Sequence, residues 1–326
     1  MSMKKVSVVM CTYNGEKYLS RQLDSILNQT YPISELYIQD DYSSDSTISI
    51  IQEYQKKYPN IRYSVNSKQK GINENFYSAI SKATGDYVAI SDQDDIWHPS
   101  KIEREMDCIG NNYLCFCFSQ PFLGDVEPDF DSKPVKLDSN IPNFGLMRLC
   151  VCNVVPGHTM LMKRELLELL PHKNFRIYYD GAYAILASAY NKIAFCNEIL
   201  SFHRRLETSV TFTPEIERPK VFFMNAFFLL SSAFKKRRDL RVKIGCSYSE
   251  MSRFLSKINC PSKDLHDSAR LAKLLSKQGF FSTLQAMALC VRRRNDIFYN
   301  KDMNNLRAIV RALSHPVYHY SLFDYS

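Results

Sequence analysis

The stretch that decides the fold reads Asp86-Tyr-Val-Ala-Ile90-Ser91-Asp92-Gln93-Asp94-Asp95, an apolar run that stops abruptly at acidic residues. An apolar run of this length, bounded by polar residues, is typical of a buried strand rather than of a helix. We therefore predict a strand over residues 86–90 whose end carries Asp92 and Asp94. The ninety residues before it follow the same pattern of short apolar runs that end in polar residues.

Three more apolar runs of strand length lie upstream, at residues 6–11, 36–38 and 61–65. Helical patterns separate them, at residues 18–27, from a cap at 43–45 to about 57, and at 73–82. This alternation predicts βαβ units and a parallel sheet. Ligands of such sheets bind beyond the carboxyl ends of the strands, so residues 12–14, 40–41 and 92–94 should share one edge.

The remainder of the chain is less regular. Residues 119–145 contain several prolines and acids and are predicted to form a long loop. We then expect a strand at 159–162, helices at 164–170 and 180–190, and two short strands at 192–195 and 199–202. From about residue 215 the pattern is helical. We therefore divide the chain into a catalytic-type domain over 1–212, with halves 1–100 and 101–212, and a helical region over 213–326.

Composition excludes some classes of protein. The net charge is +8, and its basic clusters at 235–238 and 292–294 come without any RNA- or DNA-binding motif, so we expect no nucleic-acid partner. The chain starts without an apolar leader, which predicts a cytoplasmic protein with its ten cysteines reduced. Cys115 and Cys117 lie in an apolar run and are interpreted as small hydrophobic residues rather than zinc ligands.

The polar strand ends suggest chemistry, although each is weak alone. Asp92 and Asp94 could together hold Mg²⁺ or Mn²⁺, which prefer hard oxygen ligands, but Asp is also common in surface turns. A carboxylate at Asp40 or Asp41 could accept hydrogen bonds from a ribose or a base, whereas Asp45 could instead cap the next helix.

Taken in order, these pieces resemble the family-2 glycosyltransferases of the GT-A fold, and in particular their rhamnosyltransferase-like subgroup. In the first hundred residues the resemblance rests on four segments, which are Val6–Gly15, Leu19–Tyr31, Ile38–Thr47 and Ser91–Lys101. It continues through Pro156–Met160 and through Tyr179-Asp180 with Lys192–Phe195. The resemblance implies a Rossmann-like, mainly parallel α/β sheet flanked by helices, with a helical C-terminal extension.

The resemblance also implies roles for individual residues. Contacts to a nucleotide sugar, a dTDP- or UDP-sugar, would come from Thr12, Asn14, Glu16, Asp41, Asp92 and Gln93. Asp92 and Asp94 would hold Mg²⁺ or Mn²⁺, and Asp180 would be the general base of an inverting transfer to a saccharide or lipid-linked saccharide.

Five further residues are candidates for contacts to the acceptor or the diphosphate: Asp95, Trp97, His158, His203 and Arg204. His158, His203 and Trp97 also have structural alternatives, and for His203 the alternative is packing at a strand end. His203 and Arg204 lie in Phe202-His203-Arg204-Arg205-Leu206, where the family's Tyr-Arg-x-His spacing is shifted. His158 could line the acceptor pocket or fill the sheet edge. Trp97 could pack beneath the loop rather than stack on a sugar.

The apolar segment 221–234 and the basic cluster 235–238 that follows it have two readings. The segment is shorter than the roughly 20 residues that a membrane-spanning helix needs. It could cover the catalytic domain, or it could lie on the inner face of the cytoplasmic membrane with the basic cluster on anionic lipids. A peripheral position there would suit a lipid-linked acceptor in surface polysaccharide synthesis.

Two other functional classes compete with a glycosyltransferase. A dehydrogenase would need Gly-x-Gly-x-x-Gly after the first strand, and a nucleotidyltransferase would need a Gly- and Arg-rich first loop; this chain has neither. A catalytically silent scaffold on the membrane would keep the fold without the acids, whereas Asp92, Asp94 and Asp180 are all present.

Overall fold

A computed structural model of the chain describes residues 3–123, 142–170, 176–205, 242–298 and 304–318, together with Pro128. The chain separates into two compact units. The first contains residues 1–141, 155–169 and 192–212, and the second contains residues 142–154, 170–191 and 213–326. Each unit is described by itself below.

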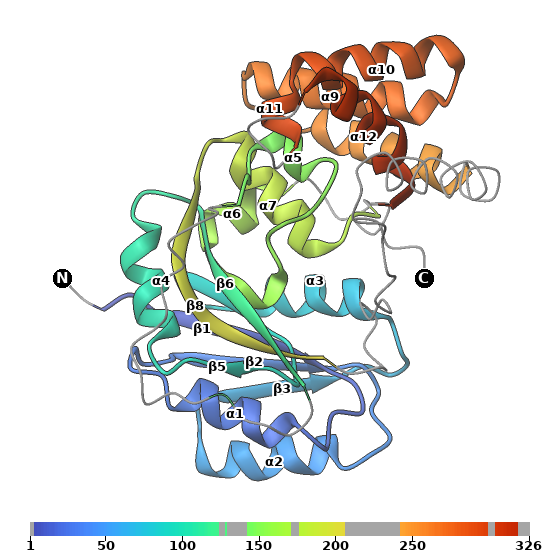
Figure 1. Ribbon diagram of the computed structural model, residues 1–326. Helices are drawn as coiled ribbons and strands as arrows, with labels where there is room; N and C mark the ends of the chain where they lie inside the picture. Colours follow the sequence, from blue (N-terminus) through green and yellow to red (C-terminus); the bar gives the residue numbers. More distant parts are fainter. Residues whose placement is uncertain are drawn as a thin grey trace. The chain divides into compact units, whose positions relative to one another are not determined.

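A single mixed sheet forms the centre of the first unit (Figure 1). Across the described residues its strand order is β3-β2-β1-β4-β7-β6-β8-β5. Strands β1 to β4 are mutually parallel, as the sequence predicted, and β7 joins β4 in the antiparallel sense. The strands are β1 Val6–Thr12, β2 Glu35–Asp40, β3 Ile61–Val65, β4 Tyr87–Ser91, β5 Ile96–Trp97, β6 Leu114–Leu123, β7 Met160–Lys163 and β8 Ile193–Arg205.

Helices cover the sheet because side chains alternate along each strand. Val6, Val8 and Met10 of β1 all point to the face where Leu23 and Ile26 of α1 are fully buried. Figure 1 shows α1 and α2 on one side of the parallel strands and α3 on the other. The helices of this unit are α1 Leu19–Leu27, α2 Thr47–Lys57, α3 Ile72–Lys82, α4 Lys101–Ile109 and α6 Arg164–Leu169, with the 3-10 turn η1 Gly157–Thr159.

Two sequence predictions were wrong around β6 and β8. The two short strands expected at 192–195 and 199–202 are one strand, because a β-bulge absorbs the polar residues Asn197 and Glu198 that interrupt the apolar pattern. The expected loop also begins late, since residues 119–123 continue β6 along β8. Pro121 is tolerated there because β7 pairs with β6 only at 114–116, leaving an unpaired edge beyond.

Helices are the main regular elements among the described residues of the second unit, as predicted for the C-terminal region; Ile177 forms an isolated β-bridge. The second unit also includes α7, whose residues are nearly all buried, as expected for a helix that is apolar all round. A helix spans 242–255. The others are α5 Leu146–Leu149, α7 Tyr179–Ala189, α9 Lys263–Lys277, α10 Phe280–Arg292, α11 Arg294–Ile297 and α12 Asn305–Tyr318.

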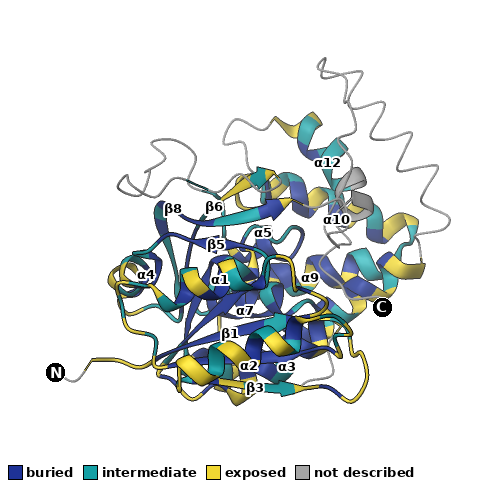
Figure 2. Cartoon of the chain, turned by 90° about the horizontal axis from the view of Figure 1, so that it is seen from below, coloured by how far each residue is buried: buried dark blue, intermediate teal, exposed yellow. Residues whose placement is uncertain are grey.

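Burial along the chain follows these elements (Figure 2). In the second unit, Leu271 of α9, Leu289 of α10 and Ala308 of α12 belong to one apolar cluster. No helix among the described residues combines the length and the apolar character needed to cross a bilayer. The apolar segment 221–234, the basic cluster 235–238 and most of the aromatic tail at 317–325 lie outside the described residues.

Candidate active site

The loop between β4 and β5 gathers four functional candidates in four consecutive residues, 92–95. Ser91 fixes its start: the side-chain amide of Gln22 donates to Ser91 Oγ at 2.7 Å, and Ser91 Oγ donates to the carbonyl of Asp92 at 2.8 Å. Ile96 fixes its end by pairing with Phe202 of β8. The loop is therefore held at both ends by the sheet.

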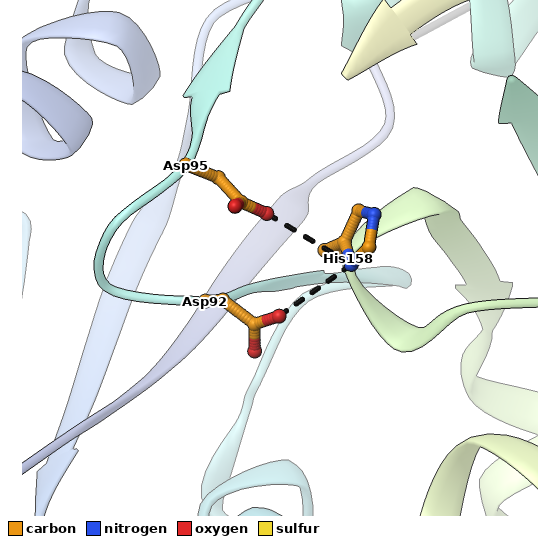
Figure 3. Close-up of side chains that lie close together, drawn as sticks. All are labelled: Asp92, Asp95 and His158. Atoms are coloured by element: carbon orange, nitrogen blue, oxygen red, sulfur yellow. Dashed lines mark ion pairs between the residues drawn. The ribbon is translucent and has the colours of Figure 1, made fainter. Parts of the chain in front are cut away.

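Asp92 and Asp95 converge on His158 of η1 (Figure 3). Nδ1 of His158 lies 3.5 Å from Oδ2 of Asp92 and 3.8 Å from Oδ2 of Asp95. The ligand atoms of the three residues all lie within 4.8 Å of one another. Asp95 is buried, and its Oδ2 has no hydrogen-bond partner among the described residues. We call Asp92, Asp94, Asp95 and His158 the acid corner.

Burial and neighbouring charges shift the pKa values of Asp94, Asp95 and His158 in the acid corner. Burial, and then the negative charge of Asp92, raises the pKa of Asp94 to about 6. Burial also raises the pKa of Asp95; the nearby His158 opposes that shift, and the charges of Asp92 and Asp94 reinforce it. Burial alone would lower the pKa of His158, but the carboxylates of Asp95 and Asp92 outweigh it and raise that pKa. The acid corner therefore holds several negative charges that the neighbouring positive groups neutralise only in part.

Arg204, on β8, is hydrogen-bonded to the loop of residues 92–95. Its backbone N–H donates to Oδ1 of Asp95 at 3.3 Å, and its Nε–H donates to the carbonyl of Asp94 at 3.1 Å. The central carbon of its guanidinium lies 4.1 Å from the ring centroid of Tyr18 and 4.5 Å from that of Phe122. These two cation–π contacts help to hold the side chain in one place. Arg204 is buried and positions the acid corner.

A serine hydroxyl joins the two histidines predicted from the sequence. Oγ of Ser119, on β6, lies 2.9 Å from Nε2 of His158 and 2.8 Å from Nδ1 of His203 on β8. Burial, and then the positive charges of His158 and Arg205, lowers the pKa of His203 to about 4. The structure thus brings His203 next to the acid corner through Ser119.

A second group of polar residues follows β1 and β2, and we call residues 12–16 and 40–47 the β1–β2 rim. Thr12 is buried and donates its hydroxyl to Oδ2 of Asp40 at 2.7 Å. Asp40 also accepts from the hydroxyl of Ser43 at 2.6 Å, and the Ser43 hydroxyl accepts from the backbone N–H of Asn14 at 2.9 Å. Asn14 is exposed and accepts from the backbone N–H of Ser44 at 2.9 Å.

Asp41 is buried and bound on both carboxylate oxygens. Oδ1 accepts from the side-chain amide of Asn66 at 2.7 Å and from the backbone N–H of Lys70 at 2.8 Å. Oδ2 accepts from the backbone N–H of Gly71 at 2.9 Å. Gly71 has a φ of 87°, in the region that favours glycine. Asp41 therefore fixes the loop between β3 and α3 against the β1–β2 rim.

Unusual backbone geometry concentrates on the β1–β2 rim. Asn14 has a φ of 46° and Tyr42 a φ of 70°, and both lie directly beyond a strand end. Tyrosine rarely adopts positive φ, and residues in such conformations cluster at binding sites. Tyr42 is 59% exposed and Tyr13 is 44% exposed, so the β1–β2 rim carries two exposed aromatic residues.

Gln93 connects the β1–β2 rim to the acid corner. Its Oε1 accepts from the backbone N–H of Tyr13 at 2.9 Å, and its Nε2 donates to the carbonyl of Tyr13 at 3.0 Å. A Cβ at Gly15 would lie only 2.3 Å from Oε1 of Gln93, so a larger residue there would displace the Gln93 side chain from this position. Glu16, which is exposed, accepts from the backbone N–H of Ser46 at 2.9 Å.

Comparison with known proteins identifies the family. The sequence pattern of glycosyl transferase family 2 matches residues 7–170, half of the chain. This chain belongs to glycosyl transferase family 2. That match includes the β1–β2 rim and the acid corner, and it confirms the resemblance noted from the sequence.

Individual relatives agree with the family assignment. This glycosyltransferase is 43% identical over 114 residues to the dTDP-rhamnosyl transferase RfbG of Shigella flexneri, a match that spans only 33% of this chain and 39% of that relative. It is 26% identical over 266 residues to the GalNAc(5)-diNAcBac-PP-undecaprenol beta-1,3-glucosyltransferase of Campylobacter jejuni, covering 78% of this chain and 84% of the other.

The fold matches solved glycosyltransferases. The crystal structure of S. aureus TarS 1–349 in complex with UDP-GlcNAc has a TM-score of 0.56 at 16% identity, covering 97% of this chain and 89% of that one. A likeness at this identity shows the fold alone. Together with the family match, it confirms the predicted GT-A architecture.

Two more residues predicted from the sequence, Trp97 and Asp180, belong to different units of this glycosyltransferase. Trp97 is buried in the core, and Nζ of Lys101 lies 4.2 Å from its ring centroid, so the ring packs beneath the loop as the structural alternative proposed. Lys101 in turn forms a fully buried ion pair with Glu105 at 2.9 Å. Asp180 belongs to the second unit, in the first turn of α7, where its Oδ1 accepts from the backbone N–H of Gly181 at 2.6 Å.

Sequence reasoning missed Ser119 and the partnership of Asp95 with His158. Ser119 fell in the stretch predicted to be a loop, and a single serine carries no pattern of its own. Asp95 and His158 are 63 positions apart in the sequence, and only the antiparallel pairing of β7 with β4 brings the end of η1 to the acids. Of the acids named from the sequence, Asp92 belongs to the group converging on His158, and the carboxylate of Asp94 does not.

Proposed function

We propose that this family 2 glycosyltransferase is an inverting enzyme that acts in surface polysaccharide synthesis. It moves a sugar from a dTDP- or UDP-sugar to a hydroxyl of a saccharide or lipid-linked saccharide. The observation that carries the proposal is the acid corner, which lies beyond a parallel strand end and is tied by Gln93 to the preformed β1–β2 rim. The names of RfbG and of the undecaprenol-linked relative support the choice of donor and acceptor classes.

A divalent cation fits the acid corner. Oδ2 of Asp95 is a buried oxygen without a hydrogen-bond partner among the described residues, and burial together with the charge of Asp92 raises the pKa of Asp94 and of Asp95. Oxygen ligands of this kind suit Mg²⁺ or Mn²⁺. We assign Asp92 and Asp94 to the ion, as predicted from the sequence, and add Asp95 and His158, whose ligand atoms lie within 4.8 Å of one another and of that of Asp92. When bound, such an ion would neutralise charge on the departing diphosphate.

The β1–β2 rim would receive the nucleoside. Thr12 and Asp41 are buried and shape the rim, whereas Asn14 and Glu16 are exposed at its edge. Hydrogen bonds already fix each of these side chains, so little side-chain freedom is lost when a ligand binds. Gln93 would meet the nucleotide where the rim joins the acid corner. Arg204 and Trp97, both buried, would act by positioning the loop.

Asp180 is our candidate for the general base. Inverting transfer requires a carboxylate within hydrogen-bond reach of the attacking hydroxyl, opposite the departing diphosphate. The transition state resembles the oxocarbenium ion of glycoside hydrolysis. Because inversion takes a single in-line displacement by the acceptor hydroxyl, no covalent intermediate on the protein is needed. Asp180 is the acid in the segment that matches the rhamnosyltransferase-like members.

The acceptor side is proposed to meet the cytoplasmic face of a membrane. A lipid-linked acceptor would place the enzyme there peripherally, with the apolar segment 221–234 and the basic cluster 235–238 as the contacting residues. Vesicle co-sedimentation checks this point: removal of the four basic residues should release the protein from anionic vesicles and leave donor binding intact.

Calorimetry and two variants test the proposal. UDP or dTDP should bind only with Mn²⁺ or Mg²⁺ present; equal binding without metal would count against the metal role. Asp94→Ala should abolish both donor hydrolysis and transfer. Asp180→Asn should abolish transfer while donor binding survives, and full transfer by this variant would refute the base assignment. A silent scaffold would show neither hydrolysis nor transfer in the unmodified protein.

A further inference from the structure

Three large apolar side chains are exposed together at the turn between α9 and α10 of the second unit. The two helices lie side by side, and only Gln278 and Gly279 join them (Figure 1). Directly after this turn, Phe280 is 73% exposed, Phe281 is 76% exposed and Leu284 is 45% exposed. Single apolar residues are common on protein surfaces, but a contiguous group of them marks a site of interaction.

The turn holds these side chains on one surface. The backbone N–H of Gly279 donates to the hydroxyl of Ser282 at 2.9 Å, which caps the start of α10. Phe280 and Leu284 are four residues apart on α10, and Phe281 and Leu284 are three apart, so all three side chains are neighbours on the helix surface. The fold therefore presents the apolar group in advance, without a rearrangement of the turn.

Basic residues surround this apolar group. Residues 268–295 contain no acidic residue and six basic ones, which are Arg270, Lys273, Lys277, Arg292, Arg293 and Arg294. Arg292 and Arg293 form ion pairs with Asp267. Lys273 and Lys277 are exposed four residues apart on α9, and no described acid forms an ion pair with either of them. We call Lys273, Lys277, Phe280, Phe281 and Leu284 the α9–α10 tip.

The helix over residues 242–255 adds to the same surface. A Cβ at Gly245 would lie 3.3 Å from the carbonyl oxygen of Ser276, so this helix packs against the last turn of α9. Val242, one turn before Gly245, is 73% exposed, and its neighbour Lys243 is exposed as well. An exposed apolar side chain next to a basic one thus recurs beside the α9–α10 tip.

We propose that the α9–α10 tip binds the surface of an anionic phospholipid bilayer. Phe280, Phe281 and Leu284 enter the boundary between headgroups and acyl chains, where exposed aromatic and leucine side chains are stable. Lys273 and Lys277 lie against the anionic headgroups, whose negative potential attracts them. This surface is separate from the apolar segment 221–234 and the basic cluster 235–238, and its residues belong to different helices.

Charge favours a bilayer over a second copy of the chain as the partner. In a two-fold contact through the α9–α10 tip, the same surface of both copies would meet, so Lys273 and Lys277 would face like charges. Like charges across an interface oppose association. An anionic bilayer complements the lysines and accepts the apolar side chains at the same time.

Fluorescence of a Phe281→Trp variant of the full chain tests the proposal directly. With vesicles of phosphatidylglycerol and phosphatidylethanolamine, the emission of the new tryptophan should shift to the blue, and brominated lipids should quench it. Vesicles of phosphatidylcholine alone should produce neither effect. The native Trp97 is buried, and its emission in the unmodified protein supplies the background to subtract.

The end of α2 offers a matched control. Tyr58 is 38% exposed and follows the exposed Lys56 and Lys57, so it is also an aromatic residue beside two lysines. Tyr58→Trp should show neither the blue shift nor the quenching. Quenching equal to that of Phe281→Trp would mean that the vesicles bind the chain without regard to the α9–α10 tip, and would overturn the proposal.

Co-sedimentation with the same anionic vesicles measures how much the tip contributes. Phe280→Ser combined with Phe281→Ser should weaken vesicle binding by about tenfold or more. Lys273→Glu combined with Lys277→Glu should also weaken it, with a smaller difference at high salt, because salt screens exposed charges. Lys56→Glu combined with Lys57→Glu makes the same change of charge on α2 and should bind as the unmodified protein does.

Several outcomes would overturn the proposal. They are an unquenched Phe281→Trp and undiminished vesicle binding by the double serine variant. A lower unfolding temperature of the serine variant would show that another part of the chain covers the tip, and a change in its sedimentation coefficient would show that a second copy does. Because quenching reports on position 281 itself and needs no donor, acceptor or metal, failure of the proposed function leaves this result untouched.

Discussion

The β1–β2 rim and the acid corner both have paired aspartates at the ends of parallel strands, yet the two pairs differ in how many hydrogen bonds their carboxylates accept. Asp41 is buried with hydrogen bonds to both of its carboxylate oxygens, and Asp40 is bound by Thr12 and Ser43. Asp95 is equally buried, but its Oδ2 has no hydrogen-bond partner within the part of the chain that the structure describes. The carboxylates of the β1–β2 rim therefore have hydrogen-bond donors from the fold, whereas the acid corner leaves a buried carboxylate oxygen without one.

This difference distinguishes aspartates that stabilise the fold from aspartates that are left available for catalysis. A buried carboxylate with a full set of donors stabilises the loops that bind it, whereas buried carboxylates that crowd each other destabilise the folded state. Such crowding is tolerated where function needs the charge. Substitution should therefore have opposite effects on stability in the two regions, and catalysis should depend most directly on the acid corner.

The largest expected effect is on activity at the acid corner. Asp92→Asn removes the charge that faces His158 while keeping the size of the side chain, and transfer should fall by about 100-fold or more. Steady-state transfer assays with saturating Mn²⁺ measure this loss. Asp107→Asn, at an exposed acid on α4, is the control and should retain full activity. If Asp92→Asn were equally active, the acid corner would be a surface turn.

The next effect is on the stability of the β1–β2 rim. Asp41→Ala leaves the N–H groups of Lys70 and Gly71 and the amide of Asn66 without their acceptor, and should lower the free energy of unfolding by about 3 kcal/mol. Urea unfolding of the first unit, followed by Trp97 fluorescence, measures it. Asp107→Ala should change stability by less than about 0.5 kcal/mol. A similarly small change for Asp41→Ala would mean that the rim does not depend on this carboxylate.

A smaller effect of opposite sign is expected at Asp94. Its pKa in the folded protein, about 6, lies above its ordinary value of 3.8, so the folded state binds the proton more tightly than the unfolded state. The contribution of Asp94 to stability is therefore fully present below its ordinary pKa and is lost as pH rises from about 4 through about 6. At neutral pH and without metal, Asp94→Asn should be more stable than the unmodified protein by about 1–2 kcal/mol.

The pH series supplies its own control for Asp94→Asn. Urea midpoints of the two proteins should converge below the ordinary carboxyl pKa, because Asp94 is then protonated in both states. If the variant were less stable than the unmodified protein at neutral pH, Asp94 would be an acid that stabilises the fold, as Asp41 is.

The smallest effect concerns the link between the two regions. Gly15→Ala would place a methyl group 2.3 Å from Oε1 of Gln93 and push that side chain off the backbone of Tyr13. Because the amide is the end of a flexible side chain, we expect a cost of about 1 kcal/mol, seen as a roughly fivefold rise in donor KM. In a Gln93→Ala background the same substitution should have little further effect. Equal effects in both backgrounds would show that Gly15 acts without Gln93.

Much of the first unit could be predicted because its signals are local. The runs at 6–11, 36–38, 61–65 and 86–90 are bounded by polar residues, and the structure confirms a strand at each. The shared edge followed from parallel pairing alone, which places 12–14, 40–41 and 92–94 together. β6 and β8 were harder, because a bulge at Asn197 and Glu198 breaks the apolar alternation without breaking the strand.

The sequence by itself determined the family, the parallel half of the sheet and the acids at its edge, because strand periodicity and short motifs are properties of neighbouring residues. Only the tertiary structure decided how those acids are used. Antiparallel β7 brings His158 to Asp92 and Asp95, and β8 brings Arg204 and, through Ser119, His203. Burial and charge at a point depend on segments far apart in the chain. For that reason no local pattern distinguishes a satisfied Asp41 from an unsatisfied Asp95.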